Sequence, residues 1–227
     1  MSDNQKTNVG AEKQAFSING FLEKNSKMMM IVGGALVLVC AAWWYVADVY
    51  KPKKEKAANS ALFFPQANLR NDSIELALNG DGENMGLIEV AKKYSGTLAG
   101  QQAALHVARI YMNQEKYKEA IEYIDKVDFD DEILAATVIG LKGDCYVEMD
   151  DVKKGAEYFM KAANKRDNLF TTPYHLQKAA RAYMFLNDSK SALKALERIK
   201  EDYNKTYYAA DIDKEIEMAK AGMIDNK

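Results

Sequence analysis

An uncharged apolar run near the N-terminus constrains this chain more than any other feature. Residues 28–47, MMMIVGGALVLVCAAWWYVA, contain no charged side chain. A helix rises about 1.5 Å per residue, so a run of this length spans about 30 Å, the thickness of bilayer hydrocarbon. Aromatic residues that favour the headgroup region follow at its C-terminal end: Trp43, Trp44, Tyr45 and Tyr50. We therefore expect a transmembrane helix that begins at Met28 and ends with Tyr50.

Two other interpretations of the run are less favourable. The apolar core of a cleaved signal peptide has about 7–15 residues and ends in small side chains, whereas bulky residues 43–46 occupy the exit of this run. A lipoprotein signal ending at Cys40 would need a small residue where Val39 stands. A single uncleaved span is the favoured interpretation.

The lysines beside the run do not set its orientation. The polar N-terminal tail, residues 1–27, carries as many lysines as the opposite flank: Lys6, Lys13, Lys24 and Lys27 against Lys51, Lys53, Lys54 and Lys56. Positive charge would otherwise mark the cytoplasmic side. Apolar residues within 16–22 of the tail suit either an interfacial turn or a docking segment.

Residues 51–227 are long enough for a core of their own, and their pattern is helical. Apolar residues recur at intervals of three and four, as at Leu105, Ala108 and Met112, and alternation with period two is scarce. The chain has only 3 prolines, which leaves long helices uninterrupted. We expect an all-α domain, with residues 71–84 as its clearest loop. The net charge of −2 gives no field that would attract nucleic acid.

Three internal repeats emerge when the chain is aligned on Tyr111, Tyr146 and Tyr183, spaced by 35 and 37 residues. Three residues before each tyrosine is a small residue, and nine after it is another. Thirteen after it is a large apolar residue: Ile124, Phe159 or Leu196. Paired helices require this pattern, with small residues where two helices cross and large ones in the gap to the next pair.

These markers resemble the tetratricopeptide repeat, which has a period of about 34 residues. Three copies cover roughly residues 101–203, and a degenerate copy precedes them. It is indicated by residues 90–97, whose tyrosine and threonine echo those of residues 199–206. After the third copy, Tyr208, Ile212, Ile216 and Ala219 form one stripe at helical spacing, which predicts a C-terminal capping helix.

The whole layout resembles a known membrane-protein family. A polar tail ending in FLEKNSK, one span with AAWWYV at its exit, and a small repeat domain are similar to YfgM-like ancillary subunits of the SecYEG translocon, from Phe21 to about Ala163. The resemblance implies a protein of the inner (cytoplasmic) membrane with its N-terminus in the cytoplasm and its repeats in the periplasm. It also implies translocon subunits, chaperones or emerging polypeptides as partners.

No constellation for catalysis, a metal or a cofactor is apparent. We expect His106 and His175 to be separate helix-surface residues, because no third ligand accompanies them. Cys145 is expected to be a buried small side chain, and Cys40 lies in the span, so no disulfide is expected. Acidic pairs at 130–131 and 150–151 read as helix caps and solvated turns. We therefore expect neither an enzyme nor a small-molecule substrate.

A protein-binding groove is the candidate site. Tetratricopeptide folds use a stripe along the first helix of each repeat, and its mixed methionine, aromatic and arginine character suits polypeptide recognition. The residues we select are Leu105, Arg109, Met112, Asp144, Tyr174, Arg181, Met184 and Phe185. The sequence equally allows several of them to form core against the next repeat.

The sequence thus predicts a non-enzymatic, membrane-anchored interaction protein at the Sec translocon. A scaffold for another envelope complex, in division or outer-membrane assembly, is the alternative. A third possibility, an enzyme or transporter accessory, would require a convergent polar cluster, for which the sequence gives no sign.

Overall fold

The computed structural model describes residues 26–222, so the tail segment around residues 16–22 lies outside its description. The chain divides into two compact units, Met1–Pro52 and Lys53–Lys227.

The first unit contains α2 (Ser26–Trp44), followed by the π-helical turn η1 (Tyr45–Tyr50). No side chain of α2 is buried. Among residues 26–222 this helical segment alone is long and apolar enough to cross a membrane, and a signal sequence would satisfy the same criterion.

As far as Gly222, the second unit consists of helices and turns, with one isolated β-bridge between Gly80 and Met85. Its elements are α3 (Lys51–Arg70), which begins at the boundary, α4 (Ile74–Asn79), α5 (Leu87–Lys93), α6 (Leu98–Asn113), α7 (Tyr117–Ile124), α8 (Glu132–Glu148), α9 (Val152–Lys165), α10 (Thr171–Phe185), α11 (Ser189–Asp202), the 3₁₀ turn η2 (Tyr207–Ala209) and α12 (Ile212–Ala221). The all-α prediction is confirmed for the described residues. The expected loop at 71–84 was wrong in part, because it contains α4.

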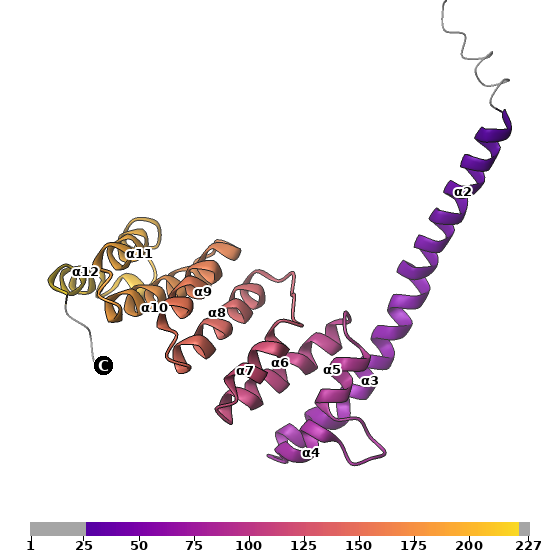
Figure 1. Ribbon diagram of the computed structural model, residues 1–227, viewed down its shortest axis with the longest axis horizontal. Helices are drawn as coiled ribbons and strands as arrows, with labels where there is room; N and C mark the ends of the chain where they lie inside the picture. The colour runs from indigo at the N-terminus through magenta and orange to yellow at the C-terminus, as the bar shows by residue number, and fades with distance from the viewer. Residues whose placement is uncertain (1–25, 223–227) are drawn as a thin grey trace, which may run out of the picture. The chain divides into compact units, whose positions relative to one another are not determined.

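Three helix pairs follow one another along the chain: α6 with α7, α8 with α9, and α10 with α11 (Figure 1). The repeat markers lie where the alignment predicts. The small residues before and after each tyrosine are buried, as are Ile124, Phe159 and Leu196. The capping helix is α12, in which Ile212, Ile216 and Ala219 are buried.

One close crossing joins α8 to α9 through two glycines. A β-carbon on Gly143 would lie 2.7 Å from the ring of Phe159, and one on Gly155 would lie 2.4 Å from a methyl group of Val147. Glycine at both positions therefore allows the two helices to approach within contact of each other's backbone.

Each first helix ends in the same way. The carbonyl of the marker tyrosine accepts a hydrogen bond from the backbone N–H five residues later: Tyr111 from Lys116, Tyr146 from Asp151 and Tyr183 from Asp188, at 2.8–2.9 Å. The residue just before each donor has a positive φ: Glu115, Asp150 and Asn187, at 58–63°. This left-handed residue reverses the chain into the second helix of the pair.

The degenerate copy before the first repeat ends with the same hydrogen bonds as the third repeat. Thr97 donates through its backbone N–H and its hydroxyl to the carbonyl of Tyr94, at 3.0 and 2.7 Å, and Thr206 does the same to Tyr203 at the same distances. The sequence echo between residues 90–97 and 199–206 thus corresponds to one local structure. It makes α5 the second helix of an incomplete repeat packed on α6.

A candidate protein-binding face

The predicted groove residues lie on α6, α8 and α10, the first helices of the three repeats, and the structure separates them into core and surface. Leu105 and Met112 are half-buried against the N-terminal core cluster. Met184 is 8% exposed and belongs to the C-terminal core cluster with Leu176 and Leu196. Met184 is therefore a packing residue, and we leave it out of the candidate face.

Asp144 joins two repeats. Its carboxylate, on α8, is paired with the ammonium of Lys178 on α10. Burial raises the pKa of the Asp144 carboxyl above its usual value, although Lys178 acts in the opposite direction. Asp144 thus links the first helices of repeats two and three.

Arg109 is exposed on α6, three residues from the half-buried His106. Burial, and then the positive charge of Arg109, hold the pKa of His106 below its usual value. Phe185 is 60% exposed at the end of α10. Arg109 and Phe185 remain candidates for partner contact.

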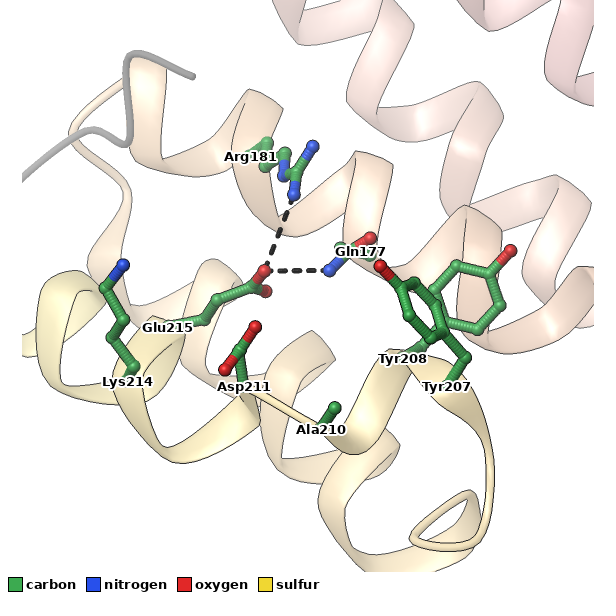
Figure 2. A pocket seen from close by; sticks show the side chains of 8 residues that line it. All are labelled: Gln177, Arg181, Tyr207, Tyr208, Ala210, Asp211, Lys214 and Glu215. Atoms are coloured by element: carbon green, nitrogen blue, oxygen red, sulfur yellow. Dashed lines mark hydrogen bonds and ion pairs between the residues drawn. The ribbon is translucent and has the colours of Figure 1, made fainter.

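The repeat-three residues meet the C-terminal segment around a hollow of about 240 Å³ (Figure 2). Gln177 and Arg181 of α10 both point toward Glu215 of α12. Gln177 Nε2 donates to Glu215 Oε1 at 2.7 Å, and the Arg181 guanidinium lies 3.5 Å from the same oxygen. The Arg181 side chain is 57% exposed. Lys214 and Asp211 complete the charged part of the wall.

Aromatic rings form the other side of the hollow. The Tyr207 and Tyr208 ring centroids are 6.0 Å apart, and Tyr208 lies 6.1 Å from Tyr174 of α10. Burial raises the pKa of the Tyr208 hydroxyl, whereas Tyr207 is 87% exposed. The hollow therefore offers apolar ring surface beside separated positive and negative charges.

The sequence analysis missed most of this hollow. It placed Tyr208 in the capping stripe but did not select Tyr207, Asp211, Lys214 or Glu215. The available signal was the repeat period, because Tyr207 lies 37 residues after Phe170 and so occupies the start of a fourth first helix.

His175 differs from expectation. It is 2% exposed, its ring lies against Gly140 of α8, and neither ring nitrogen has a hydrogen-bond partner in the protein. Burial, and then the positive charge of Lys178, lower the pKa of His175 to about 4. The expectation that both histidines lie on the surface was wrong for His175, which packs between repeats two and three.

Cys145 is fully buried, as expected, and burial raises the pKa of its thiol to about 11. Such a thiol is protonated and unreactive at neutral pH. Over residues 26–222, no group of three or more histidine, cysteine or acidic side chains is arranged to hold a metal ion.

A second hollow, of about 380 Å³, lies between the first and second repeats. Its walls are Lys118 and Ile121 of α7, Tyr146 and Met149 near the end of α8, and Asp151 and Lys154 at the start of α9. Asp151 and Lys154 already pair with each other at 2.9 Å. It contains none of the selected groove residues.

Comparison with known proteins supports the repeat assignment. A tetratricopeptide repeat family model matches residues 102–128, which span most of α6 and all of α7. Searches of curated proteins and of solved structures return no match. The matched repeat and the stacked helix pairs indicate a protein–protein interaction module.

Proposed function

We propose that this chain is a non-enzymatic interaction protein anchored in the inner membrane, with its repeats on the periplasmic side and its N-terminus in the cytoplasm. Its partners are translocon subunits, periplasmic chaperones or emerging polypeptides. The apolar residues 28–50 support the anchor, and the resemblance of the layout to ancillary translocon subunits supports the side and the partners.

The observation that carries the binding role is the hollow between α10 and the C-terminal segment. It combines the exposed ring of Tyr207 and the half-buried ring of Tyr208 with the donors of the exposed Arg181 side chain. A polypeptide offers backbone carbonyls to such donors and side chains to such rings, and tyrosine and arginine dominate the energetics of protein interfaces. The ion pair with Glu215 already restrains the Arg181 side chain, so little further ordering of Arg181 is required when a partner binds.

Site-specific crosslinking in membranes tests this role. A photoreactive benzoylphenylalanine at Tyr207 should capture a partner that mass spectrometry identifies, while the same group at Lys194, exposed on α11, should capture much less. In the full chain, Arg181→Ala with Tyr207→Ala should reduce capture by a crosslinker at Tyr174 at least about tenfold, since each central anchor contributes about 2 kcal/mol.

The matched control is Lys190→Ala with Lys194→Ala, two exposed residues of α11. Equal loss of capture from both pairs would assign binding to general surface charge and remove the hollow from the proposal. Capture of division or outer-membrane assembly proteins in place of translocon subunits or chaperones would favour the alternative scaffold role.

The membrane side has its own test. Protease added to cells with permeabilised outer membranes and sealed inner membranes should digest the chain from Lys51 onward. Complete protection of that region would overturn the orientation and leave the binding role of the hollow untouched.

A further inference from the structure

One exposed apolar side chain recurs at the same position of every repeat. Each lies at or near the start of a first helix, thirteen residues before the marker tyrosine, and the fourth continues the spacing at the capping segment. This apolar row consists of Leu98, Ile133, Phe170 and Tyr207. Their exposed fractions are 54%, 47%, 71% and 87%. Leu134 and Leu169 beside the row are also exposed.

The other ends of the same helices do not repeat this feature. The equivalent positions there are Asn113, Glu148 and Phe185, of which only Phe185 is apolar. Helix packing explains the buried markers but not the apolar row, because its members project into solvent. An exposed apolar side chain recurring in register at one edge indicates a surface that meets something apolar.

The first member of the row lies where the chain joins the second unit. The Glu55 carboxylate of α3 accepts hydrogen bonds from the backbone N–H groups of Leu98 and Ala99, at 2.8 and 3.0 Å. Lys54 donates to the carbonyl of Ser95 in the same turn at 3.2 Å. Glu55 follows the apolar residues 28–50 by five residues, a length of chain that reaches at most about 18 Å in any conformation. A short stretch of chain therefore connects the Leu98 end of the row to the proposed membrane anchor.

We propose that the apolar row rests on the lipid surface and inserts its side chains at the headgroup boundary. The inference rests on the membrane anchoring proposed above. Leucine, isoleucine, phenylalanine and tyrosine are the residues that bind this boundary region. The covalent connection to the anchor makes a contact with the bilayer intramolecular in effect, so a few shallow insertions suffice.

The charges beside the row indicate which lipids it meets. The residues before Ile133 include Asp130, Asp131 and Glu132, whereas those before Phe170 include Lys165, Arg166 and Asp167. Four acidic side chains against two basic ones leave this edge with a net negative charge, so attraction to anionic lipid does not hold the row. Apolar insertion into a zwitterionic surface accounts for the contact.

Tryptophan quenching in vesicles tests the inference. The full chain is reconstituted in phosphatidylcholine with brominated acyl chains, after Trp43→Phe and Trp44→Phe remove the native tryptophans. Phe170→Trp then reports on the row, Leu186→Trp reports on the opposite end of α10, and Tyr207→Trp is a second sensor on the row. We expect quenching and a blue shift at positions 170 and 207, with neither at 186. Ile133→Ser with Leu134→Ser should reduce the quenching at position 170.

Other outcomes overturn the inference in distinguishable ways. Equal quenching at 170 and 186 would remove the lipid contact. A blue shift at 170 that appears only as the protein-to-lipid ratio rises, without quenching, would assign the row to a second copy of the chain. In the parent chain Trp43 and Trp44 report on the anchor itself. If bromolipid fails to quench them, the anchoring proposal fails together with this inference, whereas their quenching with an unquenched position 170 rejects the lipid contact alone.

Discussion

The imidazole of His175 lies against the α-carbon of Gly140, so that a β-carbon on Gly140 would be 2.1 Å from the ring. The two residues belong to α10 and α8, the first helices of neighbouring repeats. The contact makes glycine necessary at position 140 and keeps water away from the ring.

Gly140→Ala should destabilise the repeat domain by about 1–3 kcal/mol, because a methyl group 2.1 Å from the buried ring forces the ring or the packing of α8 on α10 to shift. Urea unfolding in detergent micelles, followed by circular dichroism, measures the change. The control is Gly82→Ala, which also adds a methyl group but has nothing within 4 Å, although its φ of +94° adds local strain. A larger loss at Gly82 than at Gly140 would contradict the close contact.

Stability should fall as the pH drops from 7 to 5. The ordinary pKa of histidine is 6.5, whereas that of buried His175 is about 4, so the unfolded chain binds a proton in this interval and the folded chain does not. The contribution of His175 to stability is complete above the pKa of the unfolded chain, and it is lost as the pH falls toward the pKa of the folded chain. The loss in the free energy of unfolding between pH 7 and pH 5 is about 2 kcal/mol.

His175→Leu should remove most of this dependence, since leucine does not titrate and leaves no buried nitrogen without a partner. Urea midpoints of the variant and the parent at both pH values make the comparison. Parallel losses in the two proteins would show that other groups are responsible for the pH effect.

Lys116→Asp should stabilise the first repeat by about 1 kcal/mol. Asp151 and Asp188 hold the equivalent positions and accept hydrogen bonds from the N–H groups three residues later, at 3.2 and 3.1 Å. Lys116 shares their backbone angles but caps α7 with no side-chain hydrogen bond.

Thermal unfolding of three variants separates the hydrogen bond from the charge. Lys116→Asn should retain most of the gain, and Lys116→Ala should show none. Equal melting temperatures for the aspartate and alanine variants would rule out a missing cap.

Glu115→Gly should also raise stability, by about 1 kcal/mol, because Glu115 has a φ of 59° and side chains other than asparagine and aspartate adopt this region at a cost. Asn187→Gly, at the equivalent position with a φ of 58°, should change stability much less. Similar gains at both sites would contradict an origin in left-handed strain at Glu115, because asparagine adopts this region at little cost. Denaturant midpoints supply the measurement.

The repeat register could be predicted from the sequence because it depends on side-chain size within each helix pair. Small residues such as Gly143 and Gly155 have a clear meaning once their spacing recurs. The burial of Met184 and His175 could not be predicted in this way. A 3.6-residue period shows which residues share a helix face, but not whether that face meets solvent or the next repeat.

Other features depended on contacts between distant segments. Glycine is needed at position 140 because of a ring 35 residues later in the chain. The hollow depends on contact between Arg181 of α10 and Glu215 of α12, which α11 and η2 separate in the sequence. The short helix α4 lies in a segment rich in asparagine, aspartate and glycine, whose composition alone favours a loop.

The marker tyrosines are spaced by 35 and 37 residues, and the difference arises in the connection between repeats. From each marker tyrosine to the left-handed residue the count never varies, because a backbone hydrogen bond to the tyrosine carbonyl fixes it. The two extra residues lie between Ala162 and Phe170, where α9 continues to Lys165, whereas the shorter counterpart between Val127 and Ile133 follows a helix that ends at Ile124. The molecule therefore has one permissive edge, where the connection between repeats can change in length, and one rigid edge, where insertion after Asp150 would break the joint within a repeat.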